Sequence, residues 1–101
     1  MLQKGDLFKH FKGTSLDDKN ICEVLEIGVK YSGDNSDKPI ENLVVYKNVF
    51  QNKIFARELE DLTAELSPEK QKEYGQKHRV EKLNEEELKY IKEKLNSIKK
   101  E

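Results

Sequence analysis

The stretch KGDLFKHFKG at residues 4–13, followed later in the chain by LVVY at residues 43–46, decides the fold. The first stretch is a basic and aromatic ribbon between two glycines, and the second is a fully apolar run. β-Branched and aromatic residues favour strands, whereas a glycine at a strand often marks a bend. The two stretches together predict a small curled sheet, and neither carries a catalytic motif.

Three further strands are expected downstream of the ribbon. Residues 21–31 alternate apolar and polar side chains, which is typical of a half-buried strand, although Glu23 interrupts the apolar stripe. Residues 42–50 and 53–59 predict two more strands, because the few residues between them suit a hairpin. These three strands should form an antiparallel meander.

The remaining part of the sheet region consists of the ribbon and a loop. Residues 7–12 are expected to form a fourth strand. Residues 32–39, with the sequence SGDNSDKP, are dense in turn-forming residues and predict a mobile loop between two of the strands.

Two helices are expected after the strands. Ser67 and Pro68 provide a cap and a first-turn proline for a short helix that ends near Gly75. Asn84 is a cap residue for a longer helix, and three glutamates follow it at the positive end of the helix dipole. The apolar stripe of this second helix consists of Leu88, Ile91, Leu95 and Ile98.

The stripe on the second helix is narrow and must pack against something. One interpretation is that it docks on the sheet of its own chain. The other is that it pairs with a partner helix, including self-association with a second copy through the same four residues.

Composition limits the classes of function. The chain has 101 residues, enough for one domain with one core, and its net charge of −1 argues against the strong positive field of an obligate nucleic-acid binder. The charge is uneven, because acidic residues predominate in the middle of the chain and basic residues at both ends.

Cysteine usage and the N-terminus predict the compartment. Cys22 is the only cysteine, so no intramolecular disulfide is possible, and we expect a buried, inert thiol in a reducing, cytoplasmic setting. The N-terminus lacks the apolar run of a secretory signal, and no stretch is long and apolar enough to cross a membrane. We therefore expect no membrane partner.

No motif for a cofactor or a metal is present in the sequence. A phosphate-cradling glycine loop and a His-Glu-x-x-His pair are both missing, and His10 and His78 are the only histidines. We expect no cofactor and no metal.

The order of these pieces resembles a small bacterial family catalogued as domain of unknown function 1653. The resemblance begins at residues 4–13, continues through the strands around residues 23–27, 43–46 and 55–57, and extends faintly to residues 76–81. It implies a compact SH3-like β-barrel with an uncharacterised biochemical role. The expected fold class is therefore mainly β with C-terminal α: a small antiparallel SH3-like barrel, one short helix and one longer C-terminal helix. The expected division is a barrel domain with the short helix at residues 1–83 and an amphipathic helix at residues 84–101.

The candidate binding residues are those that the ribbon and the resemblance single out, and no catalytic residue is assigned. They are Phe8, His10, Lys12, Tyr46 and Arg57.

Each of these residues also has a structural interpretation. His10 is either a base or a half-buried histidine in an aromatic cluster. Arg57 either binds an anion or forms a structural ion pair with Asp6, Glu23 or Asp61, of which Glu23 is the first to consider. The ribbon aromatics either stack on bases or belong to the core.

The sequence favours a non-catalytic binding module, because a barrel of this size has little room for a closed active site. Its ligand would be a protein segment or a short nucleic acid. The alternative is a small hydrolase or anion-handling enzyme in which His10 acts as the base and Arg57 stabilises negative charge.

Overall fold

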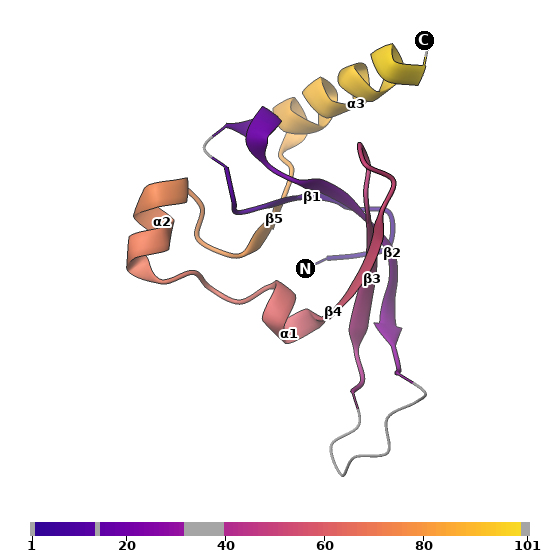
Figure 1. The fold of residues 1–101 in the computed structure, drawn as a ribbon, viewed down its shortest axis with the longest axis vertical. Coiled ribbons are helices and arrows are strands. Elements are labelled where there is room, and N and C mark those ends of the chain that lie inside the picture. Colours follow the sequence, from indigo (N-terminus) through magenta and orange to yellow (C-terminus); the bar gives the residue numbers. More distant parts are fainter. Residues whose placement is uncertain (1, 14, 32–39, 100–101) are drawn as a thin grey trace.

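The computed structural model describes residues 2–13, 15–31 and 40–99, and within them the chain forms one antiparallel sheet with helices around it (Figure 1). The sheet has five strands in the order β4-β3-β2-β1-β5. The strands are β1 Leu7–His10, β2 Ile21–Val29, β3 Leu43–Asn48, β4 Ile54–Glu58 and β5 Val80–Lys82. The helices are the 3-10 turn η1 Leu16–Asp18, α1 Leu59–Leu62, α2 Pro68–Tyr74 and α3 Glu85–Lys99.

The antiparallel sheet predicted from the sequence is confirmed, and about as many described residues lie in helices as in strands, so the fold is mixed α/β. Within the described residues the two edge strands, β4 and β5, do not pair with each other, and the sheet stays open. The chain turns into α1 directly after β4 instead of crossing to β5. An isolated antiparallel bridge between Glu65 and His78 joins the segment after α1 to the segment before β5. The loop predicted at residues 32–39 lies outside the described residues.

Strand β2 departs from simple alternation because its register with β3 shifts twice, between Val24 and Glu26 and between Glu26 and Val29. Each shift changes which side chains face which side of the sheet. Before the first shift the strand is buried on both faces, since Ile21, Cys22 and Val24 are all at most 4% exposed. The predicted single apolar stripe is therefore only partly right.

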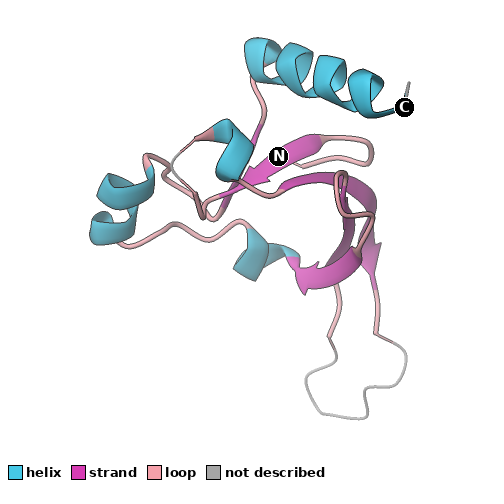
Figure 2. Cartoon of the chain, turned by 45° about the horizontal axis from the view of Figure 1, so that its top comes forward, coloured by secondary structure: helices cyan, strands magenta, loops and turns pink. Residues whose placement is uncertain are grey.

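One face of the sheet is concave, and the main core fills it. Figure 2 shows the curl of the sheet, with α1 inside the curve and α3 on the outer side. Leu62 of α1 is fully buried among the sheet residues of this core. The buried residues of this main core are Leu2, Phe8, Cys22, Val24, Val44, Leu62 and Val80.

The opposite face of the sheet carries α3. Ile91 is 1% exposed and forms a second buried cluster with Ile21 and Leu83, against which Leu88 and Leu95 also pack. The apolar stripe of the long helix therefore packs against the sheet of its own chain, which is the first of the two interpretations given above. Only Ile98 of the four stripe residues remains exposed, at 53%.

Both helix caps form as the sequence predicts. The Ser67 hydroxyl accepts a hydrogen bond from the Lys70 backbone N–H, and Gly75 ends α2 in the left-handed conformation at φ 66°. Asn84 and Glu87 form a reciprocal capping box at the start of α3: the Glu87 N–H donates to the Asn84 side chain at 2.8 Å, and the Asn84 N–H donates to the Glu87 carboxylate at 3.0 Å.

Within the described part of the chain, no helix has both the length and the apolar character that crossing a membrane requires.

Candidate functional site

The register of the strands places four of the five candidate residues on the concave face. Phe8 pairs with Cys22, and Val24 pairs with Tyr46, so these side chains share one side of the sheet. His10 lies two residues after Phe8 on the same strand. Arg57 joins them, because it pairs with Val44, two residues before Tyr46. Lys12 lies beyond the end of β1 and is exposed.

Phe8 belongs to the core of this face. Its side chain is 0% exposed and meets the Tyr46 ring edge-on, with the ring centroids 5.4 Å apart. A side chain without exposed surface has nothing to offer a ligand. Phe8 therefore supports the site by fixing the position of Tyr46.

Tyr46 and Phe55 form the aromatic part of the site. Their rings are stacked with centroids 5.7 Å apart and an interplanar angle of 27°. Tyr46 is half-buried, whereas Phe55 is 45% exposed. An exposed aromatic ring supported from below by another ring is a preformed stacking surface.

A hollow of about 170 Å³ lies beside this aromatic pair. It is large enough for a small group, such as part of a base or a side chain, but not for a whole drug-sized ligand. Its walls are formed by His10, Asn20, Cys22, Tyr46, Asn48, Gln51 and Phe55.

His10 lines the hollow and also carries a buried polar atom without a partner. Its Nδ1 is buried and has no hydrogen-bond partner, and its ring packs against Phe11 with the centroids 4.8 Å apart. Burial lowers the pKa of His10, and the nearby charges of Lys12, Arg57, Arg79 and Lys19 lower it further. The imidazole is therefore neutral at pH 7, with hydrogen-bonding capacity that the protein does not use.

Arg57 is held by an acid on the following helix. Its Nε donates to the Asp61 carboxylate at 2.5 Å, and this contact lowers the pKa of Asp61. Glu23, the partner considered first from the sequence, is the wrong choice because its register with Lys47 places it on the opposite face of the sheet. Asp61 lies four residues after Arg57, so the turn into α1 brings the two together.

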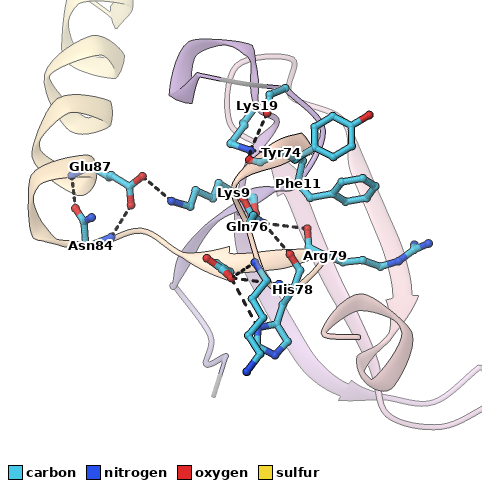
Figure 3. A network of polar contacts seen from close by, with 12 residues as sticks. Lys9, Phe11, Lys19, Tyr74, Gln76, His78, Arg79, Asn84 and Glu87 are labelled. Atoms are coloured by element: carbon cyan, nitrogen blue, oxygen red, sulfur yellow. Dashed lines mark hydrogen bonds and ion pairs between the residues drawn. The ribbon is translucent and has the colours of Figure 1, made fainter. Parts of the chain in front are cut away.

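Arg79 adds an unpaired charge to the same region. Within the described residues its guanidinium has no ion pair, yet it lies close enough to lower the pKa of both His10 and Asp61. Figure 3 shows the side chains of Phe11, Tyr74 and Arg79 on the side away from α3.

Sequence reasoning missed Phe55 and Arg79. Phe55 is exposed because β4 is an edge strand, and the order of the strands cannot be read from the residues of one strand. Arg79 precedes a strand of three residues that no periodicity could reveal. The alternation of Phe55 with Arg57 does place an aromatic and a cation on one face, but it does not show that this strand lies at the edge of the sheet.

A polar network holds the rim of the site in place (Figure 3). The Lys19 ammonium donates to the backbone carbonyls of Phe11 and Gly13 at 2.8 and 2.9 Å and reaches that of Tyr74 at 3.5 Å. The buried Gln76 amide donates to the carbonyls of His78 and Arg79 at 2.9 and 3.3 Å. These contacts fix the end of β1 and the approach to β5, and with them His10 and Arg79.

Two further observations concern the thiol at the site and the possible metal ligands among the described residues. Cys22 lines the hollow, but burial raises the pKa of its thiol to about 11, so almost none of it is thiolate at neutral pH. Among the described residues, no group of three or more His, Cys, Asp and Glu side chains is arranged to hold a metal ion.

Comparison of the chain with models of known families, with curated proteins and with solved structures finds no match in any of the three. The resemblance to domain of unknown function 1653 therefore stays a prediction from the residues quoted above.

Proposed function

We propose that the chain is a non-catalytic binding module that holds a short single-stranded nucleic acid on the concave side of its sheet. The observation that carries this proposal is the stacked pair of Tyr46 and the exposed Phe55 beside a region in which His10 experiences four cationic neighbours. Aromatic platforms that stack on bases, combined with cations that track the phosphates, are the common means of binding single strands.

The distribution of charge supports a nucleic acid over a protein segment. The net charge of the whole chain is −1, yet Lys12, Arg57 and Arg79 all lie close enough to His10 to lower its pKa. Arg57 already has Asp61 as a partner, so Lys12 and Arg79 are the cations most available to phosphates. A base stacked on Phe55 would lie beside the hollow that His10 also lines.

The proposal extends to the fold and the family. The open sheet, with the bridge between Glu65 and His78 near its gap, is compatible with a partly open SH3-like barrel of the kind that domain of unknown function 1653 implies. Membership of that family, and work in the bacterial cytoplasm, are parts of the same proposal.

The test is the affinity for fluorescently labelled oligonucleotides of eight nucleotides, single-stranded RNA and DNA, measured by anisotropy at low salt. Phe55→Ala should weaken binding by roughly tenfold or more, since stacking of one base contributes about 1–3 kcal/mol. Ile54→Ala is the matched control, because Ile54 is the neighbouring residue, is 63% exposed and lies on the opposite face of the strand. It should leave the affinity unchanged.

Salt dependence provides the second measurement. The affinity should fall steeply as salt rises, and Arg79→Gln should reduce the slope of that dependence by about one phosphate contact. Undetectable binding at low salt, or equal effects of the two variants Phe55→Ala and Ile54→Ala, would refute the proposal. A salt-independent affinity for peptides instead would favour a protein segment as the ligand.

A second candidate, an anion-handling hydrolase, is favoured by one observation: His10 and Arg57 share a face, and the pKa of His10 is lowered so that the imidazole is free to accept a proton. This candidate function requires that the chain hydrolyse phosphate or carboxylate esters and that the variant His10→Gln lose this activity. Binding of oligonucleotides without any hydrolysis would exclude it.

A further inference from the structure

The outer edge of β4 is a regular strand edge that no described strand covers. β4 ends the sheet, and its five residues pair with β3 without a single register shift. Proteins commonly protect such edges with proline, a bulge or a very short strand. The other edge strand, β5, has only three residues, whereas β4 has five and contains neither proline nor a bulge.

Apolar surface is concentrated on the same strand. Ile54 is 63% exposed and Phe55 45%, and these are adjacent residues on opposite faces of the sheet. Ala56 is also exposed. The edge therefore combines unpaired backbone groups with apolar side chains on both faces, which is the composition of a strand-pairing surface.

The hydrogen bonds to β3 determine which backbone groups face outward. The Asn48 N–H donates to the Lys53 carbonyl at 2.8 Å, and the Leu59 N–H donates to the Asn42 carbonyl at 3.1 Å. In an antiparallel ladder these contacts alternate along the strand, so Phe55 and Arg57 also direct their backbone groups to β3. The groups of Ile54, Ala56 and Glu58 point away from the sheet.

This pattern suits a second copy of the same strand. If Ala56 lies opposite Ala56 of another chain, the outward-facing residues pair with each other, Ile54 with Glu58 and Glu58 with Ile54. On one face, Ile54 and Ala56 of both chains then form a continuous apolar strip. On the concave face, Phe55 lies opposite Arg57 of the second copy, an aromatic–cation pair that occurs twice by symmetry.

We propose that two copies of this chain associate through antiparallel pairing of their β4 strands, with Ala56 at the two-fold axis. The interface is small, so the association is weak and depends on concentration. It joins two five-stranded sheets into one and places the two concave faces side by side. The proposal does not depend on the ligand of those faces.

Disulfide trapping tests the register. In Ala56→Cys the two cysteines lie opposite each other as a hydrogen-bonded pair, with their Cα atoms about 5.5 Å apart, within the range that a disulfide spans. Ile54→Cys is the matched control on the same face of the same strand. Its two cysteines lie four positions apart along the paired strands, roughly 14 Å, and cannot bond. Cys22 is buried and does not compete.

Under mild oxidation, Ala56→Cys should yield a cross-linked dimer at least ten times faster than Ile54→Cys, as read on a non-reducing gel. Sedimentation of the full chain should show a mass that rises with concentration. In Ala56→Pro the mass should rise only at concentrations at least tenfold higher, because proline removes the outward N–H that would pair with the second copy and leaves the bonds to β3 intact. If the proline variant does not fold, the same measurement is made on Ala56→Lys. Equal or reversed cross-linking rates, or a monomer at every concentration, would overturn the proposal.

Discussion

At the scale of single residues, the environment of His10 departs most from what its sequence neighbours suggest. The sequence offered a base or a half-buried histidine, and the structure gives a ring against Phe11 with a buried Nδ1 that has no partner. Neighbouring cations and burial act in the same direction, because both disfavour the imidazolium. The consequence is a dependence of stability on pH.

His10 should make the fold less stable in mild acid. Its pKa in the folded chain lies below the value of about 6.5 that it has when unfolded. As the pH falls below about 6.5, the unfolded chain binds a proton that the folded chain does not, so the free energy of unfolding decreases. Urea unfolding of the wild type and His10→Gln between pH 7.5 and 5 should show a smaller decrease for the variant.

The control for this experiment is His78→Gln, which removes the other histidine of the chain. NMR titration of the same samples identifies the imidazole directly. A His10 that is protonated at pH 6.5 in the folded chain, or identical pH profiles for the wild type and His10→Gln, would contradict the expectation. An anionic ligand on the concave face should raise the pKa of His10, which connects this measurement to the proposed function.

At the scale of the elements, the sequence predicted those with a local signature. Four strands and both longer helices were predicted within a few residues of their bounds, because alternation, Ser67, Pro68, Gly75 and Asn84 are local signals. α1 and β5 were not predicted, since segments of four and three residues are too short for any period to show. The partner of Arg57 depended on that unpredicted α1, which is why Glu23 was considered before Asp61.

The capping box of α3 should contribute measurably to stability. Asn84→Ala removes the side-chain acceptor of the Glu87 N–H and should lower the free energy of unfolding by about 1 kcal/mol. Asn96→Ala is the matched control, because Asn96 is an exposed residue within the same helix. This control should change the free energy of unfolding by no more than about 0.5 kcal/mol. Equal losses of stability in the two variants would show that the cap contributes nothing.

At the scale of the whole molecule, the chain has a sheet with two different faces. The concave face combines the main core with the candidate site, while the other face is covered by α3. The sequence predicted one core and did not locate α3. An amphipathic stripe indicates that one face of a helix is buried, but it does not identify the surface against which that face packs. The sequence predicted a curled sheet, but it did not predict the two register shifts between β2 and β3, because such shifts have no signature in the residue pattern.

The docking of α3 on the sheet should contribute strongly to the stability of the fold. Ile91 is 1% exposed between Ile21 and Leu83, so Ile91→Ala should lower the free energy of unfolding by about 2–5 kcal/mol. Ile98→Ala removes the same atoms from the same helix at a side chain that is 53% exposed, and should cost at most about 0.5 kcal/mol. For a domain of this size, with a stability of about 5 kcal/mol or more, the first loss is a large part of the total. Urea unfolding at a concentration at which the chain is monomeric distinguishes docking on the chain's own sheet from pairing with a second helix. If α3 were free in the monomer, both variants would unfold at the same urea concentration as the wild type.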